Sequence, residues 1–445
     1  MFYSNRLPMA TTVLKFGGTS VQDADAIKRL IKIVESKAGQ RLVVVSALAG
    51  VTNSLVEIVK LWEKKKSKAA NEIIQKLKSR HLDVASNLEQ KETSQIEKLF
   101  YDLSKKIKTR YKIKSTDAVY ATGELASSLL ISSAFKNAKW IDARDYIVTN
   151  SEFNNAQVDF KSSYKKSAKL VGLLQSHILI TQGFIGANSK KLTTTLGRGG
   201  SDYSAAVFGA AIGAARVEIW TDVDGILSTD PRIVPEATAI PVLHFKEASE
   251  MAYFGAKVLH PATIFPAIEK KIPVIILNSK NPTNPGTTIA FDDTQKTNAI
   301  CGIAFKKNIT LVNIYSTRML RAHGFLKSLF DVFAKHKLSV DLISTSEVNV
   351  SLTLDPNSDQ KAIDSVKSEL AKFSDVEVNN NRALISVIGG GIRTTSGLAA
   401  KIFNELIDTN IQMISMGASE LNISFVVNSD QCDDVVRRLH RKLIN

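Results

Sequence analysis

The chain has 445 residues, a hydrophobic content of 44% and a formal net charge of +15 at pH 7. This length predicts two or three domains, each large enough to bury a core of its own. No apolar run approaches the roughly 18 residues of a membrane span, and the first ten residues lack a hydrophobic signal core, so we expect a cytoplasmic protein without a membrane partner. Residues 1–12 are interpreted as an N-terminal extension, and the sequence leaves open whether translation starts at Met1 or Met9.

The two cysteines and the basic charge point to no special chemistry. Cys301 and Cys432 stand far apart and outside any Cys-x-x-Cys pattern, so we expect packing residues rather than a disulfide or a zinc site. The lysine-rich stretch at 64–68 has no interleaved aromatic residues, which favours a solvated helix face over a nucleic-acid surface. We expect no nucleic-acid partner, and the positive field would attract anionic substrates.

The first motif reads Lys-Phe-Gly-Gly-Thr-Ser-Val at residues 15–21 and follows the apolar pair Val13-Leu14. The paired glycines Gly17 and Gly18 let the backbone approach an anion without a Cβ in the way, and Lys15 adds a full positive charge. The spacing matches neither G-x-x-x-x-G-K-[ST] nor G-x-G-x-x-G. From these residues alone, the motif is either a phosphate-binding loop or an ordinary strand-to-helix turn.

Short β-branched runs alternate with helical patterns through the first 300 residues, which predicts an α/β fold with a largely parallel sheet between helices. The clearest strands are expected at residues 42–45, 178–181, 217–220 and 274–277. Residues 54–115 carry only helical periodicity and much charge, and we interpret them as a helical excursion over the acceptor site.

A second glycine motif, Thr-Thr-Thr-Leu-Gly-Arg-Gly-Gly-Ser-Asp, occupies residues 193–202 and leads into a run of small residues. Its turn would offer backbone N–H groups and a helix N-terminus to an anion. Arg198 can grip a carboxylate through two parallel hydrogen bonds, and Asp202 stands at the start of the helix.

The Pro/Gly/Asn cluster at 281–286 and the polar stretch 292–298 indicate a domain boundary near residue 295. Beyond it the chain repeats at an offset of 73 residues, where Ser-Glu-Val-Asn-Val-Ser at 346–351 matches Ser-Glu-Leu-Asn-Ile-Ser at 419–424. Each copy reads as strand, helix, strand, which predicts two small α+β modules. The expected division is a domain at 13–295 and modules at 300–372 and 373–445.

These segments occur in an order that resembles aspartate kinases, which have the amino-acid kinase fold, and among them most closely the lysine-sensitive monofunctional type. The paired modules resemble ACT domains, the amino-acid-sensing units of many metabolic enzymes. The resemblance implies ATP-dependent phosphorylation of the side-chain carboxylate of L-aspartate to 4-phospho-L-aspartate, the first step toward lysine, threonine and methionine. It also implies magnesium arriving with ATP and no dedicated metal site.

The resemblance assigns roles to individual residues. The catalytic residues it implies are Lys15, Arg198 and Asp202. Those implied for ATP are Lys15, Gly17, Gly18, Thr221, Asp222, Arg232, Lys257 and Val258. Those implied for aspartate are Ser46, Thr52, Glu124, Arg198, Gly199, Gly200 and Ser201.

Several of these residues also have simpler interpretations. Glu124 as a bare residue is more often a surface or first-turn helix carboxylate, whereas the resemblance gives it the ammonium group of aspartate. Ser46 and Thr52 are also good helix-capping residues. His260 is interpreted as structural, and Leu227 stands where relatives often have a tyrosine near the nucleotide, which leaves one nucleotide contact open.

The first module is expected to bind an inhibitor, lysine, across a homodimer of first modules. The effector residues that the resemblance implies are Met319, Gly324, Phe325, Leu326, Ser339, Val340, Asp341, Ser346 and Glu347. At the 73-residue offset Asp341 becomes Ile414, so only the first copy keeps an aspartate suited to an effector's ammonium group. Ala322 replaces a serine of some lysine-sensitive relatives and leaves one polar contact open.

Two other functions are compatible with parts of the sequence. A kinase acting on glutamate or acetylglutamate is disfavoured by the motif at 15–21 and by the paired modules. A catalytically inactive amino-acid sensor would keep the modules but lose reactive-site residues, and these are all present: Lys15, Glu124, Arg198, Asp202 and Lys257.

Overall fold

The structure is a computed structural model that describes residues 10–255, 259, 261–291, 299–320 and 323–444. The chain forms two compact units, the first from Met1–Ile226 and Leu259–Phe291, the second from Leu227–Val258 and Asp292–Asn445. Residues 227–258, which we had placed in the kinase domain, therefore group with the C-terminal modules. The expected boundary near residue 295 lies outside the described residues.

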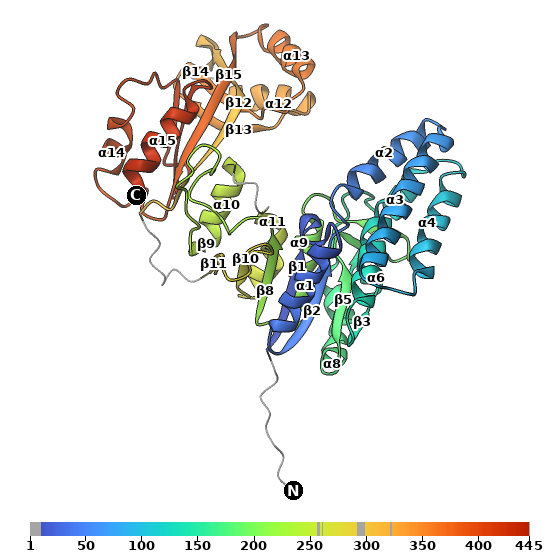
Figure 1. Ribbon diagram of the computed structural model, residues 1–445. Helices are drawn as coiled ribbons and strands as arrows, with labels where there is room; N and C mark the ends of the chain where they lie inside the picture. Colours follow the sequence, from blue (N-terminus) through green and yellow to red (C-terminus); the bar gives the residue numbers. More distant parts are fainter. Residues whose placement is uncertain (1–9, 256–258, 260, 292–298, 321–322, 445) are drawn as a thin grey trace. The chain divides into compact units, whose positions relative to one another are not determined.

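Seven strands of the first unit form a sheet in the order β3-β5-β2-β1-β8-β10-β11 (Figure 1). Neighbouring strands are parallel, except that β11 runs antiparallel to β10. The strands are β1 (Thr11–Phe16), β2 (Gln40–Val45), β3 (Ala138–Trp140), β5 (Ile178–Gln182), β8 (Arg216–Thr221), β10 (Val274–Asn278) and β11 (Thr287–Ala290). The four strands expected from the sequence lie within β2, β5, β8 and β10, and the largely parallel α/β sheet is confirmed.

The central strand β1 is buried along almost its whole length, as expected for a parallel sheet covered on both faces. Lys15 is its penultimate residue and lies opposite Val44 of β2 and Ile219 of β8. The carboxyl ends of β1, β2, β5 and β8 therefore meet at one edge of the sheet, where ligands bind in open α/β folds.

Helices cover the sheet, and a small second sheet in the order β4-β6-β7 adjoins it. The helices of the first unit are α1 (Ala24–Ser36), α2 (Val51–Glu63), α3 (Ser67–Asn87), α4 (Ser94–Lys106), α5 (Thr116–Tyr120), α6 (Thr122–Ser133), α7 (Phe160–Ser167), α8 (Leu170–Leu174), α9 (Gly200–Ile212) and α11 (Pro261–Glu269), with 3-10 turns η1 (Gly18–Val21), η2 (Ile113–Ser115) and η3 (Ala143–Asp145). The small strands are β4 (Val148–Thr149), β6 (Ile185–Asn188) and β7 (Thr193–Thr195). Helices α2, α3 and α4 form the helical excursion expected over residues 54–115 (Figure 1).

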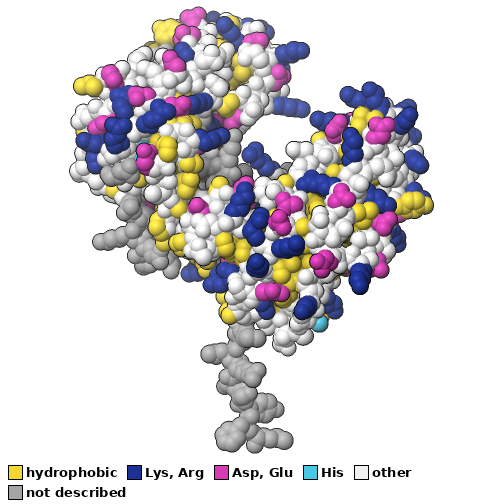
Figure 2. Space-filling view, in the orientation of Figure 1, with side chains coloured by type: hydrophobic (Ala, Val, Ile, Leu, Met, Phe, Trp, Pro, Cys, Tyr) yellow, Lys and Arg dark blue, Asp and Glu magenta, His cyan; other side chains and the backbone are white. Residues whose placement is uncertain are grey.

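The surface carries both signs of charge. Figure 2 shows lysine and arginine side chains spread over the visible face with aspartate and glutamate among them. The lysines at 64, 65, 66 and 68 are all exposed, where α2 ends and α3 begins. Within the part of the chain that the structure describes, no helix is long and apolar enough to cross a membrane.

The second unit is built on a six-stranded antiparallel sheet in the order β13-β14-β12-β15-β17-β16. Its strands are β12 (Gly302–Tyr315), β13 (Val340–Thr345), β14 (Asn349–Leu354), β15 (Asp375–Ile388), β16 (Met413–Met416) and β17 (Asn422–Asn428). The short strand β9 (Val242–His244) and the remaining elements complete the unit: α10 (Phe245–Phe254), η4 (Thr317–Met319), α12 (Phe325–Lys335), α13 (Gln360–Leu370), α14 (Leu398–Asn404) and α15 (Cys432–Leu443).

The two repeats share their longest strands. Strands β12 and β15 have 14 residues each and pair along their whole length. Ile303 in the first half of β12 packs in a cluster with Ile385 and Phe425 of the second repeat, whereas Val312 in its second half packs around Leu352 of the first. The expectation of two consecutive modules thus differs from the structure, because each repeat contributes half a strand to the core of the other.

Candidate active site

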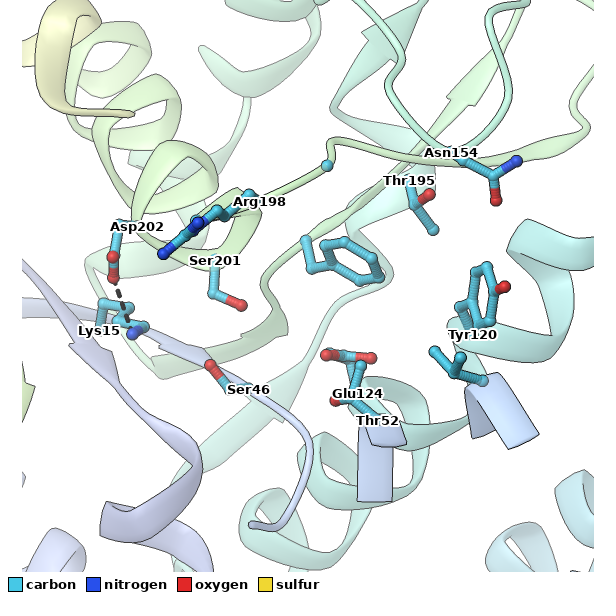
Figure 3. A pocket seen from close by; sticks show the side chains of 15 residues that line it. Lys15, Ser46, Thr52, Tyr120, Glu124, Asn154, Thr195, Arg198, Ser201 and Asp202 are labelled. Carbon is cyan, nitrogen blue, oxygen red and sulfur yellow. Dashed lines mark ion pairs between the residues drawn. The ribbon is translucent and has the colours of Figure 1, made fainter. Parts of the chain in front are cut away.

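A cavity of about 560 Å³ lies in the first unit, at the carboxyl ends of the parallel strands (Figure 3). All the residues predicted to bind aspartate or to act in catalysis line it. The lining residues are Lys15, Ser46, Thr52, Val56, Tyr120, Glu124, Asn154, Phe184, Thr195, Gly197, Arg198, Gly199, Gly200, Ser201 and Asp202.

Lys15 and Asp202 form an ion pair at one end of this cavity, with 2.7 Å between Nζ and Oδ1. Lys15 comes from β1 and Asp202 from the first turn of α9, so the pair joins the sheet to that helix (Figure 3). A Cβ added at Gly17 would lie 3.6 Å from the Lys15 ammonium. The glycine therefore keeps the space beside the lysine open, as a phosphate-binding loop requires.

The loop before α9 places several N–H groups and Arg198 at the cavity. Gly199 is the N-cap of α9 and has a φ of 70°, which glycine adopts without strain. Gly183 lies so close to Ser201 that an added Cβ would come within 2.6 Å of the serine Cβ. These glycines let the loop approach the end of β5, and they leave the N-terminus of α9 facing the cavity.

Glu124, in the first turn of α6, lies between the Lys15–Asp202 pair and Tyr120 in the view of Figure 3. Its side chain is buried, and Oε1 accepts a 3.4 Å hydrogen bond from the N–H of Ala47. Its other oxygen, Oε2, has no hydrogen-bond partner among the described residues. Burial raises the pKa of Glu124 to about 8, and no positively charged side chain among the described residues pairs with this carboxyl group.

Ser46 and Thr52 line the cavity and do not cap α2. The N-cap of α2 is Gly50, with a φ of 81° and no side-chain cap hydrogen bond, and Thr52 lies inside the first turn. The capping interpretation is therefore wrong for this helix, and both hydroxyl groups remain available at the cavity.

Sequence reasoning missed part of the wall. Val56, Tyr120, Asn154 and Phe184 line the cavity without belonging to a motif assigned to aspartate, and Thr195 and Gly197 line it within the motif at 193–202 without a predicted role. Phe184 has a φ of 70°, which is unusual for a bulky residue. The sequence feature that could have identified Thr195 as a wall residue is its position at the end of the β-branched run 193–195, next to the glycine turn.

The residues predicted for ATP are distributed over both units. In the first unit, Gly17 and Gly18 follow β1, Thr221 is the last residue of β8 and Asp222 follows it. The N–H of Gly17 donates a 3.0 Å hydrogen bond to the Trp220 carbonyl. Arg232 belongs to the second unit, is mostly exposed and pairs with Asp230 at 2.5 Å. Lys257, Val258 and His260 lie outside the described residues. Leu227 forms an isolated β-bridge with Ala239 in the second unit.

The predicted effector residues gather in the first module of the second unit. Met319, Phe325 and Val340 are partly buried against the same hydrophobic cluster. Gly324 is the N-cap of α12 with a φ of 82°, and Leu326 follows in the first turn. Ser339 precedes β13, and the Ser346 hydroxyl accepts a 3.1 Å hydrogen bond from the N–H of Asn349, beside Glu347. Ala322 lies outside the described residues.

Asp341 already has partners that the sequence did not indicate. Lys306 of β12 pairs with it at 2.9 Å, and the Tyr253 hydroxyl of α10 donates a 3.1 Å hydrogen bond to the other carboxylate oxygen. The Lys306 ammonium also lies 4.6 Å from the centre of the Tyr253 ring. Burial, and then the charge of Asp341, raise the pKa of Tyr253, so this phenol stays a hydrogen-bond donor.

Comparison with known proteins identifies the family. A model of the amino acid kinase family matches residues 10–278, and an ACT domain model matches residues 385–443. The lysine-sensitive aspartokinase 3 of Escherichia coli (strain K12) is 40% identical to this chain over 97% of the chain and 98% of its own length. The chain belongs to the aspartokinase family.

Other aspartokinases support the same assignment. Aspartokinase 2, chloroplastic, of Arabidopsis thaliana is 36% identical over 97% of this chain and 84% of its own length. The crystal structure of Escherichia coli aspartokinase III in complex with aspartate and ADP (R-state) matches 98% of this chain and all of the crystallised chain, with a TM-score of 0.83 and 39% identity. The same aspartokinase in complex with lysine and aspartate (T-state) gives a TM-score of 0.84 at 39% identity and the same coverage.

Proposed function

We propose that this chain transfers the γ-phosphoryl group of ATP to the side-chain carboxylate of L-aspartate, producing 4-phospho-L-aspartate and ADP. The observation that carries the proposal is the unpaired, buried Glu124 carboxyl group in the same cavity as Arg198 and the Lys15–Asp202 pair. An acceptor with one ammonium and two carboxylate groups matches this combination of charges. Ser46, Thr52, Ser201 and the N–H groups of Gly199 and Gly200 would complete the acceptor contacts.

The transfer needs no general base. The side-chain carboxylate of aspartate has a reference pKa near 4 and is ionised at neutral pH. One of its oxygens forms a bond to the γ-phosphorus while the bond from that phosphorus to the bridging oxygen of ADP breaks, and ADP leaves with the electron pair. The protein therefore contributes alignment and charge neutralisation, as is general for phosphoryl transfer.

Lys15 is proposed to neutralise charge on the transferring group, and Asp202 to hold the ammonium of Lys15 in place. We propose that magnesium enters as part of the MgATP substrate. Among the described residues, no group of three or more His, Cys, Asp and Glu side chains is arranged to hold a metal ion. A metal carried by the phosphates fits such a site, because magnesium is commonly bound through one or two carboxylates and the substrate phosphates.

The proposal is tested by ADP release from the purified protein with magnesium, ATP and L-aspartate, compared with glutamate and acetylglutamate. We expect turnover that depends on aspartate and is reduced by lysine more than by threonine or methionine. Turnover with glutamate or acetylglutamate instead would assign a different acceptor. Amino-acid binding without any turnover would support the inactive-sensor alternative.

Lysine is proposed to bind the first module, with its ammonium group at Asp341. The Asp341 carboxylate already carries the Lys306 ammonium, so the effector would exchange one lysine-type cation for another. That exchange would also release or reorganise Tyr253, since the phenol shares the same carboxylate. The exchange thus gives the effector a direct way to act on α10 and its segment 227–258.

We expect Asp341→Ala to raise the lysine concentration for half-inhibition at least tenfold, because the allosteric coupling energy of such sites is typically about 1–3 kcal/mol. Lys306→Met should lower the lysine concentration for half-inhibition several-fold, because the Lys306 ammonium no longer competes with the effector for Asp341. Inhibition curves, each normalised to the variant's own activity without lysine, measure both shifts. Unchanged inhibition in Asp341→Ala would rule out the site, and weaker inhibition in Lys306→Met would rule out the exchange.

A homodimer through the first module is also proposed. Strand β13 is one edge strand of its sheet, β16 being the other, and Ile343 on β13 is exposed. An exposed edge strand presents unpaired backbone groups that another chain can use. The cytoplasmic location expected from the sequence stays a prediction.

A further inference from the structure

A second buried carboxylate lies behind the wall of the acceptor cavity. Asp117 in α5 is completely buried. Both of its oxygens accept the N–H of Asn154 at 3.0 Å, and Oδ2 also accepts the N–H of Thr195 at 2.7 Å. The Thr116 hydroxyl lies 3.4 Å from Oδ1. Asp117 therefore joins three segments that are far apart in the sequence.

The two N–H groups that Asp117 holds belong to residues that line the cavity. Asn154 and Thr195 are both wall residues, and Figure 3 shows their side chains near Tyr120. Asn154 has a φ of 71°, a conformation that needs support from its surroundings. Thr195 is the last residue of β7 and directly precedes the turn that carries Arg198.

The Thr195 hydroxyl is the group through which we expect this arrangement to act on a bound acceptor. Thr195 is 1% exposed, and its hydroxyl lies beside the Asp117 carboxylate, whose pKa is raised by burial and lowered in part by a side-chain hydrogen bond from Thr195. Thr195 also lines the cavity, and a hydroxyl that donates one hydrogen bond can still accept another from a ligand. The backbone bond to Asp117 fixes where this hydroxyl stands before any ligand arrives.

The residue type at position 117 matters for the same reason. A carboxylate offers two acceptor oxygens, which can serve both N–H groups together. An asparagine offers one acceptor oxygen and places an NH₂ donor against an N–H donor. A substitution that keeps the volume would therefore place an NH₂ donor 3.0 Å from the Asn154 N–H and remove the negative charge that strengthens both backbone hydrogen bonds.

We propose that Asp117 is a positioning residue for the phosphate acceptor. It holds the backbone of Asn154 and Thr195, so that the Thr195 hydroxyl and the Arg198 turn stand in binding geometry in the empty enzyme. The inference rests on the proposed function, because the cavity it shapes is the proposed aspartate site.

The kinetic test compares Asp117→Asn with Thr195→Val and with the double variant. We expect Asp117→Asn to raise the KM for aspartate about tenfold or more and to change the KM for ATP less than twofold, since hydrogen bonds to charged groups are the stronger ones. Thr195→Val should raise the aspartate KM several-fold. The double variant should show less than the product of the two effects, because both act through the same hydroxyl.

Glu218→Gln provides a matched control for general destabilisation. Glu218 is another buried carboxylate of the first unit, paired with Lys37 at 3.1 Å and Arg216 at 2.9 Å, and it does not line the cavity. We expect Glu218→Gln to lower the unfolding temperature of the protein without raising the KM for aspartate. An equal rise in the KM of Glu218→Gln, an unchanged KM in Asp117→Asn, or fully multiplicative effects in the double variant would each overturn the proposal.

Hydrogen exchange of the wild-type protein without substrates supplies a test that needs no variant and no acceptor. Peptides covering residues 150–156 and 193–196 should show slow exchange at the amides of Asn154 and Thr195. Rapid exchange at both amides would overturn the positioning role even if the enzyme phosphorylates aspartate. Slow exchange in a protein without aspartate-dependent turnover would support the role of Asp117 and reject the proposed function.

Discussion

Lys15→Ala is expected to lower kcat about a hundredfold or more while the protein remains folded. One preorganised donor to developing charge contributes on the order of 3 kcal/mol to the transition state in comparable sites. Lys15 is the strongest candidate for that donor, because its ammonium stands beside Gly17 and is held by Asp202 at 2.7 Å. Steady-state rates at saturating ATP and aspartate, together with a thermal unfolding curve, provide the measurement.

Lys37→Ala is the control for this prediction. Lys37 also pairs with a buried carboxylate of the first unit, Glu218 at 3.1 Å, and it does not line the cavity. Both variants remove a lysine from an acidic partner, so both should lose some stability. Only Lys15→Ala should lose turnover, and near-normal kcat in that variant would refute the catalytic assignment.

Glu124→Gln is expected to raise the KM for aspartate about a hundredfold. Breaking a buried ion pair by removing one partner costs about 3–5 kcal/mol, and the glutamine amide cannot neutralise the substrate's ammonium. The effect on the KM for ATP should be small, since Glu124 is separated from Lys15 within the cavity (Figure 3). Initial rates over a range of each substrate separate the two constants.

The pH dependence of the wild-type enzyme provides an independent check on Glu124. Its pKa in the empty site is about 8, so the carboxyl group is mostly protonated at pH 6, whereas binding of the ammonium favours the ionised form. Aspartate should therefore bind more tightly as the pH rises from 6 to 8, and the gain should level off above 8. Binding near pH 7 should release a proton, visible by calorimetry in two buffers of different ionisation enthalpy. A flat profile in the wild type, or the same slope in Glu124→Gln, would contradict the assignment.

The sequence was most informative where a functional residue stands next to the strand that positions it. Lys15 is part of β1, and Ser46 directly follows β2, so a strand pattern and a neighbouring motif locate both residues. Arg198 and Asp202 belong to one turn and the helix that follows. Their placement in one cavity follows from the parallel sheet, whose carboxyl ends share an edge.

Contacts between distant segments could not be predicted in this way. Asp117 meets Thr195 across 78 residues, and Tyr253 meets Asp341 across 88. No periodicity or motif links such positions, because each contact depends on how whole elements pack. Residues 227–258 illustrate the same point, since they lie within the stretch that the amino acid kinase model matches and yet belong to the same compact unit as the C-terminal repeats.

The long strands β12 and β15 bear on how this enzyme could be re-engineered. Grafting a sensor of different specificity is usually planned as the exchange of one module. Here a junction between the two repeats would divide a sheet in which each 14-residue strand crosses both hydrophobic clusters. A chimera that preserves the fold must therefore exchange both repeats together, along with residues 227–258, whose Tyr253 and Glu250 bond to the first and the second repeat.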